Sequence, residues 1–334
     1  MKNPISILSV GVSSPGGTTS NALSNTSSWP FKAVEEVIPG RGVRDVSTID
    51  LSAEPVNRWR LRPRLRRASP LSHHLIEAVA QTLEARPEID PARVGIVGAF
   101  FLGCLVYSVK FYKGLTTDGR RFASPVLFPE TVANTPLSHV VAELGIGGPV
   151  YSQVGDTSCW ISAIRTASVW LQNGDVDHVI VAGAEEFDVH ELDGFHSVRW
   201  FDDAFPFLLA EGAGAILLGR ENKNSIARIT SIADGYSFRT RSQSRHAATD
   251  CMSTFAPNLP VAETATSWIT PFAAEATADR PSISIHCGPK VEAFTASCAW
   301  NTIFAARLIE NQTLSSIVVP AWGLSQQIGA LALA

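Results

Sequence analysis

The sequence predicts an α/β fold, in which short buried strands alternate with amphipathic helices. Residues 150–183 show this alternation most clearly. Residues 150–154 have the apolar character of a strand, and Gly155 interrupts it. From Trp160 onward, apolar residues recur at steps of three and four, which predicts one buried face of a helix. Residues 179–182 form a second short apolar run, typical of a buried strand.

The turn between the first strand and the helix carries a candidate nucleophile. It reads Asp156-Thr157-Ser158-Cys159, so Cys159 stands where the helix begins. Unpaired backbone N–H groups and the helix dipole favour a thiolate at that end of a helix. Cys159 can therefore act as a nucleophile, which is one interpretation. The alternative is a buried, chemically inert cysteine.

The remaining elements follow from the same patterns of apolar residues. Asn173-Gly174 ends the helix, because both residues tolerate the positive φ of a C-cap. Further helices are predicted at residues 69–85, 100–114 and 295–309. Further strands are predicted at residues 93–98, 227–232, 282–285 and 315–320. The polar segments 13–57 and 241–281 are predicted to be mainly loops.

Composition indicates a compact protein with a large core. The chain has 334 residues, of which 45% are hydrophobic and 17% charged, and its mean hydropathy is +0.11. Its length permits one large domain or two. The net charge of −4 gives no electrostatic support to nucleic-acid binding. The low charged fraction indicates that part of the surface is buried against another subunit.

The cysteines and acidic residues indicate neither disulfides nor a metal site. Five cysteines are present, an odd number without a Cys-x-x-Cys pair. Asp202-Asp203 lacks a supporting histidine or carboxylate at a ligand spacing. No apolar run is long enough to span a membrane, and the N-terminal run is too short for a secretory signal. We therefore expect a cytoplasmic protein.

Positive charge is concentrated in a short segment that follows the first predicted loop. A charge run of this kind is most often a solvated face. The alternative is a docking surface for an acidic partner, and the sequence favours neither. The candidates for docking are Arg60, Arg62, Arg64, Arg66 and Arg67.

The nucleophile turn resembles the Asp-Thr-Ala-Cys turn of the β-ketoacyl synthases, the condensing enzymes of fatty-acid and polyketide synthesis. Other segments are similar to that family in the same order along the chain. Each is weak alone, but together they are specific and cover residues 5–220. They are residues 7–16, 94–98, 124–129, 144–149 and 210–218, with Asn134.

The resemblance implies a thiolase-like layered fold (αβαβα) of two similar halves, with the active site at their junction. Residues 1–222 would form the first half, which holds the nucleophile, and residues 223–334 a shortened second half. The resemblance also implies a homodimer or heterodimer with another ketosynthase-like subunit. It implies acyl carrier protein as the acidic partner of the arginines, with the acyl substrate on its phosphopantetheine arm and no cofactor bound to the synthase itself.

Four further site residues are proposed on the same basis. His286 follows a predicted strand, as a catalytic histidine of the family does, although a buried histidine of the core would fit there as well. Lys290 resembles the remnant of a second histidine motif, with Glu292 where that histidine would fall. Alternatively, His286 is itself the second histidine and the first is lost. Leu324 lies in the final glycine loop, where its N–H and that of Cys159 would bind an oxyanion. Glu211 is either a general base or, as we favour, a hydrogen-bonded buried acid that shapes the site.

The departures from the family leave three hypotheses open. The second histidine motif is missing, and the loop at residues 323–327 lacks the second glycine pair. The first hypothesis is a divergent β-ketoacyl-carrier-protein synthase that acylates Cys159 and condenses or transfers the acyl chain. The second is a non-catalytic subunit resembling a chain-length factor, although such subunits usually lose the nucleophile. The third is a binding protein of the same fold in which Cys159 is inert.

Overall fold

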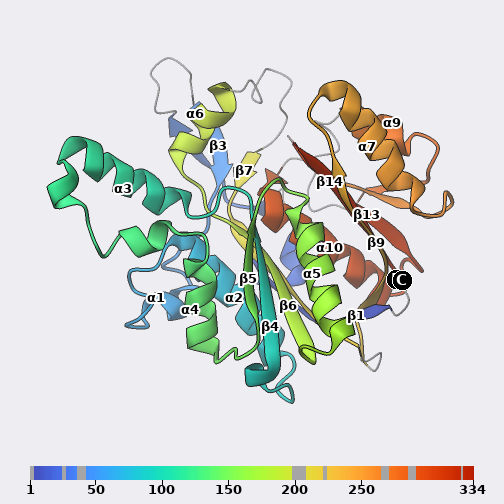
Figure 1. The fold of residues 1–334 in the computed structure, drawn as a ribbon, viewed down its shortest axis with the longest axis horizontal. Helices are drawn as coiled ribbons and strands as arrows, with labels where there is room; N and C mark the ends of the chain where they lie inside the picture. The colour runs from blue at the N-terminus through green and yellow to red at the C-terminus, as the bar shows by residue number, and fades with distance from the viewer. Residues whose placement is uncertain are drawn as a thin grey trace.

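The fold was analysed in a computed structural model. It describes residues 4–24, 28–35, 43–197, 208–220, 224–264, 271–284, 291–324 and 326–334. Within these ranges the chain forms one large mixed sheet made of two groups of strands. Helices cover the outer face of each group, and two further helices lie between the groups (Figure 1). This confirms the predicted α/β class.

The large sheet has ten strands, five from each half of the chain. The first half contributes β1 (Ile5–Ser13), β4 (Val94–Phe100), β5 (Val150–Val154), β6 (His178–Glu185) and β8 (Gly212–Gly219). The second contributes β9 (Ala227–Ser237), β10 (Val261–Glu263), β11 (Ser282–Ser284), β13 (Ile317–Trp322) and β14 (Gln327–Leu333). The strands are ordered β11-β10-β13-β14-β9-β1-β8-β6-β4-β5.

The two groups of five strands have the same topology. In each, the strand order from the outer edge to the centre is third, second, fourth, fifth and first along the chain. The second, third and fourth strands run parallel, and the fifth pairs antiparallel with both of its neighbours. A short antiparallel pairing of β1 with β9 joins the groups. The predicted boundary between residues 222 and 223 falls in a gap of the described ranges and stays a prediction.

Helices complete a five-layer arrangement. On one outer face, α2 (Pro70–Glu84) packs on β1, β6 and β8, and α4 (Thr135–Leu144) packs on α2. On the other, α7 (Arg241–Ser253) packs on β9 and β14 beside α9 (Pro271–Thr277). Between them lie α5 (Cys159–Asn173) and α10 (Phe294–Glu310), which contact strands of both groups (Figure 1).

The remaining described elements are a small second sheet, three helices and several short turns. A second sheet has the order β12-β7-β3-β2, with β12 (Val291–Glu292), β7 (Leu208–Ala210), β3 (Val43–Ser47) and β2 (Lys32–Glu35). Three helices belong to the first half: α1 (Asn57–Arg60), α3 (Leu105–Thr117) and α6 (Val189–Ser197). Short 3-10 turns occur at Ser20–Ser24, Pro91–Arg93, Arg120–Phe122 and Phe128–Thr131.

The predicted elements are largely confirmed, with two corrections. The helix that begins at Cys159 ends at Gly174, whose φ of 77° is left-handed as expected of a C-cap. The segment 241–281 is not mainly loop, because it contains α7, β10 and α9. The α7 helix has a low apolar content and was missed for that reason, although Thr240 caps it by accepting from the N–H of Gln243. The helix predicted from residue 100 begins only at Leu105, since β4 continues to Phe100.

The central layer packs against the first half at very close range. At Gly183 in β6, a Cβ atom would lie 2.4 Å from the carbonyl oxygen of Thr295 in α10. Only a glycine permits the backbone of α10 to approach this strand so closely. Gly183 therefore permits the short distance between β6 and α10.

We expect Gly183→Ala to lower the free energy of unfolding by about 1–3 kcal/mol, because the added methyl group must displace α10. Gly114→Ala is the matched control, since a Cβ atom at that helical position meets nothing within 4 Å. It should raise stability by about 0.5–1 kcal/mol. Urea unfolding followed by circular dichroism measures both, and equal effects would contradict the close packing.

Candidate active site

Cys159 begins α5 in the central layer and is almost completely buried. Its residue exposure is 5%, and its side chain belongs to the main core cluster. The thiol lies 3.7 Å from the carbonyl oxygen of Phe100, at the end of β4. The predicted position of Cys159 at a strand-to-helix turn is thus confirmed, and its thiol faces a neighbouring strand end.

The surroundings of the thiol oppose the thiolate that the helix N-terminus favours. Burial raises the pKa of the Cys159 thiol well above its ordinary value, and the carboxylates of Glu185 and Asp156 raise it further. The hydrogen bond to Phe100 and the helix N-terminus oppose this shift but do not outweigh it. A base or a change of environment is therefore needed before Cys159 can react as a nucleophile.

Asp156 joins the nucleophile turn to the final loop of the chain. Its Oδ1 accepts hydrogen bonds from the N–H groups of Thr157 (2.9 Å) and Leu324 (2.8 Å). Its Oδ2 accepts from Gln326 (2.7 Å) and Gln327 (3.2 Å). Beside it, the Thr157 hydroxyl donates to the carbonyl of Trp322 at 3.0 Å. The two halves of the chain are thus connected at the residues next to Cys159.

Both predicted oxyanion donors are engaged by this same residue. The N–H of Leu324 donates to the Asp156 carboxylate, and the N–H of Cys159 donates to the Asp156 carbonyl at 2.7 Å. Their predicted role would require both groups to turn toward a bound thioester, and it stays a prediction.

Glu185 is the carboxylate that bears most strongly on the thiol. Its Oε1 accepts from the N–H of Phe101 (2.6 Å) and from the hydroxyl of Thr295 (2.5 Å). Its Oε2 accepts from the N–H of Leu102 at 3.1 Å. Burial raises the pKa of Glu185 to about 7, against the effect of these three donors.

Further buried carboxylates stand close to Glu185. Glu186 accepts from the N–H groups of Leu71 and Val106, and burial raises its pKa to about 8. Glu292, at the position where the histidine of the missing motif would fall, is buried, and burial raises its pKa to about 7. Burial also raises the pKa of Glu191 in α6. Burial therefore raises the pKa of several acids around Glu185.

Glu211 has the contacts of a structural acid. Its two oxygens accept from the N–H groups of Ile49 (2.8 Å) and Phe187 (3.0 Å), and His74 Nε2 lies 3.7 Å away. Burial would raise the pKa of this carboxyl, but His74 and the two N–H donors together lower it below its ordinary value. These contacts fit the interpretation that Glu211 shapes the site.

The other predicted catalytic residues, His286 and Lys290, lie outside the described residues, as do Cys287 and the Asp202-Asp203 pair. Several described histidines have partners of their own: His73 with Leu65, His139 with Glu130 and His190 with Asp188. His286 accordingly stays the predicted base for Cys159.

The predicted docking arginines lie at the end of the short helix α1 and in the segment after it. Arg60, Arg62, Arg64, Arg66 and Arg67 are all exposed. The segment is fixed by the buried Trp59, whose indole N–H donates to Glu77 in α2 at 2.6 Å. Arg62 lies 3.5 Å from Glu143, so its charge is partly matched within the chain. The structure thus gives these charges a rigid base and a solvent-facing position.

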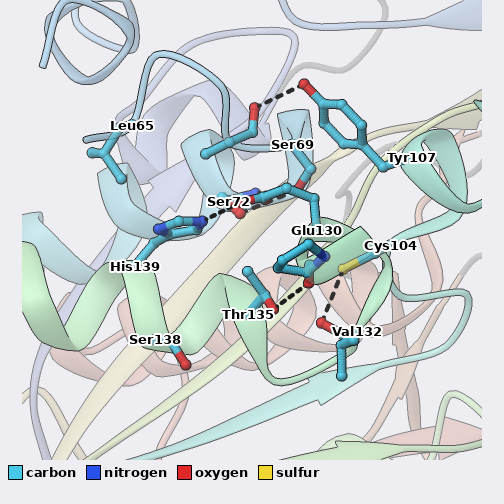
Figure 2. Close-up of polar contacts among 12 residues, drawn as sticks. Leu65, Ser69, Ser72, Cys104, Tyr107, Glu130, Val132, Thr135, Ser138 and His139 are labelled. Carbon is cyan, nitrogen blue, oxygen red and sulfur yellow. Dashed lines mark hydrogen bonds and ion pairs between the residues drawn. The ribbon is translucent and has the colours of Figure 1, made fainter. Parts of the chain in front are cut away.

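A protruding arm lies beside this segment. It consists of residues 105–132, includes α3, and projects from the body in Figure 1. No residue of α3 is buried, although Tyr112, Phe122 and Phe128 are large apolar side chains with exposures of 64%, 74% and 56%. Figure 2 shows the base of the arm, where the Cys104 thiol meets the carbonyl of Val132 at 3.6 Å. Such an apolar arm is typical of an interface.

Comparison with models of protein families shows the family of this chain. The model of the family described as "Beta-ketoacyl synthase, N-terminal domain" matches residues 54–224, more than half of the chain. The chain belongs to the β-ketoacyl synthase family. The predicted resemblance is thereby confirmed. No curated protein matches the chain significantly.

Solved structures of this family share the complete fold. The ishigamide ketosynthase/chain length factor is 17% identical with a TM-score of 0.79, and the match covers 99% of both chains. A β-ketoacyl synthase from Burkholderia phymatum STM815 is 14% identical with a TM-score of 0.76, again over 99% of both chains. A type II polyketide ketosynthase solved with its acyl-carrier protein is 16% identical with a TM-score of 0.72, covering 100% of this chain and 99% of that one. At these identities the comparisons establish the thiolase-like layered fold alone.

Two further properties concern the part of the chain that the structure describes. None of its helices combines the length and apolar composition needed to cross a membrane. Within the same ranges, no group of three or more His, Cys, Asp or Glu side chains is arranged to hold a metal ion.

Sequence reasoning missed Glu185 and Thr295. Glu185-Glu186 directly follows a buried apolar strand, and two adjacent acids at such a strand end were a usable signal. Thr295 carried no comparable signal, because its contact with Glu185 spans 110 positions. Asp156 was recognised only as part of the nucleophile turn, and its contacts with the final loop were not predicted.

We expect Asp156→Ala to lower the free energy of unfolding by about 2–4 kcal/mol, because several N–H groups of the turn and the final loop lose their acceptor. Asp177→Ala is the control, since that exposed carboxylate pairs only with arginines and should change stability by less than about 1 kcal/mol. Urea unfolding measures both variants. An Asp156→Ala protein as stable as the control would contradict the role of this carboxylate.

Proposed function

We propose that the protein is a divergent β-ketoacyl-carrier-protein synthase that accepts an acyl group on Cys159. The observation that carries the proposal is the placement of Cys159. It stands at the N-terminus of a central helix, where Asp156 joins the nucleophile turn to the final loop. Family membership supports the same reaction class.

The proposed reaction begins with transfer of the thiol proton of Cys159 to a base, for which His286 is the candidate. The sulfur attacks the carbonyl carbon of an acyl thioester and forms a tetrahedral oxyanion. Backbone N–H groups of Cys159 and Leu324 would stabilise that oxyanion after leaving Asp156. The carrier thiolate departs and takes up a proton, and the acyl group remains on Cys159. A decarboxylative Claisen condensation with a malonyl unit would follow.

Acyl carrier protein is the proposed partner, with the acyl group on its phosphopantetheine arm. The exposed arginines that follow α1 suit an acidic surface, since opposite charges speed association. A related solved structure is that of a ketosynthase with its acyl-carrier protein. A rigid base at Trp59 would present the charges in one geometry.

A second ketosynthase-like subunit is the other proposed partner. The edge strand β5 leaves Val150, Tyr151 and Val154 exposed at 44%, 52% and 56%. An open edge strand with apolar side chains is a favourable surface for pairing with another chain. Together with the apolar arm, it supports a homodimer or a heterodimer.

The alternative is a non-catalytic subunit resembling a chain-length factor. Burial disfavours the thiolate of Cys159, and both predicted oxyanion donors are engaged. These observations, with the missing second histidine motif, favour a subunit that shapes a partner's site. The nucleophile itself favours the enzyme.

The deciding experiment is intact-mass spectrometry after incubation with acyl-loaded carrier protein. We expect the acyl mass on the native chain and none on Cys159→Ala, because only the thiol can accept the group. Addition of malonyl-loaded carrier protein then tests for elongation. Absence of an adduct on folded protein would contradict the proposal and favour the non-catalytic subunit.

Charge reversal tests the docking surface separately. We expect Arg66→Glu/Arg67→Glu to slow acylation by carrier protein by about tenfold at low salt, and by less at high salt, because steering is screened. Arg93→Glu/Arg220→Glu reverses two other exposed arginines and should have little effect. Acylation by a small acyl thioester should proceed equally in all three proteins. A loss of the small-thioester reaction would indicate damage to the site instead of to docking.

A further inference from the structure

Glu185 connects the strand end at Phe100 with the start of α10. Its carboxylate accepts from the N–H groups of Phe101 and Leu102, the two residues after the carbonyl that the thiol of Cys159 contacts. The hydroxyl of Thr295, at the start of α10, donates to Oε1 of the same carboxylate. The backbone that receives the thiol is thus fixed by one buried side chain.

We propose that Glu185 is the positioning residue of the nucleophile: its carboxylate holds the backbone beside Cys159, and its charge sets how readily the thiol ionises. The inference rests on the proposed function of Cys159 as acyl acceptor. It deepens that function by assigning control of the nucleophile to a residue that the reaction itself does not use.

Three carboxylates from different elements of the fold act on the thiol of Cys159. Asp156 approaches from the nucleophile turn, Asp234 from β9 and Glu185 from β6. Cys298 of α10 interacts with Cys159 as well, but burial keeps that second thiol protonated by raising its pKa. Each of the three acids disfavours the thiolate, and Glu185 has the largest effect among them.

The surroundings of Glu185 determine the pH range in which its carboxyl group ionises. Glu186 interacts with it from just beyond β6, and Glu191 and Glu292 do so from α6 and β12; each is itself a buried acid. Thr295 and the two N–H groups oppose them, because they bind the ionised form more strongly. Since burial raises the pKa of Glu185 to about 7, this carboxyl is neutral below neutral pH and charged above it. The thiol therefore ionises, at higher pH, next to a negative charge.

The charge of Glu185 should therefore slow the reaction of the free Cys159 thiol. Removing one nearby charge should lower the pKa of Cys159 by about one unit, which raises its thiolate fraction about tenfold at pH 8. A less basic thiolate is also less nucleophilic, and this reduces the gain by about threefold. The net expectation is a rate of reaction about threefold higher.

The test is the pH profile of Cys159 alkylation by iodoacetamide, followed by quantification of the Cys159 peptide. We expect Glu185→Gln to alkylate about threefold faster than the native protein at pH 8 and to lose the inflection near pH 7. Glu186→Gln is the matched control, because it removes an adjacent buried acid that binds Leu71 and Val106 instead. The carboxylates that act on the thiol are Glu185, Asp156 and Asp234, so the alkylation rate of Glu186→Gln at pH 8 should stay close to the native rate.

A second variant covers a failure of Glu185→Gln to fold. Thr295→Val removes one donor and keeps the carboxylate, so the inflection should move to higher pH. The inference is overturned if every one of these two variants that folds keeps the native pH profile of alkylation. It is also overturned if Glu186→Gln changes the alkylation rate as much as Glu185→Gln does. Cys159 that alkylates with the expected profile but accepts no acyl group would overturn the proposed function alone. Cys159 that resists alkylation at every pH in all variants would overturn both.

Discussion

The carboxylate of Asp156 is the contact on which the geometry of the site depends. It lies one turn before Cys159 and accepts hydrogen bonds from residues up to 171 positions away. Gly323 permits the close approach to Asp156, because a side chain at this position would collide with the backbone of Gln327 and with Asp156 itself. One buried acceptor therefore aligns the end of the second half with the start of the nucleophile helix.

The same central layer explains why the nucleophile is restrained. It is a packed interior, so α5 and α10 are stabilised by apolar contacts with strands of both halves. A thiol placed there loses contact with water, and desolvation outweighs the favourable end of the helix. The neighbouring glutamates are tolerated because backbone N–H groups bind them, but their charges act on the sulfur as well. Stability of the layer and reactivity of the thiol thus have opposite requirements.

The surface has a different organisation. The apolar arm at residues 105–132 and the edge strand β5 are apolar features that the chain itself leaves uncovered. The arginines after α1 are held on a buried tryptophan and face the solvent. An apolar interface and a basic patch suit two partners of different chemistry, a second subunit and an acidic carrier.

The sequence alone determined the α/β class, the helices α2, α5 and α10, and the position of Cys159 at a helix N-terminus. These features depend on periodicity, on a glycine C-cap and on a turn motif, each encoded within a few neighbouring residues. It did not reveal α7, whose polar composition hides its helical pattern. Only the tertiary structure decided the burial of Cys159, the partners of Asp156 and Leu324, and the place of Glu185 beside the thiol. Desolvation and contacts across more than a hundred residues depend on which segments pack together, and local patterns do not contain that information.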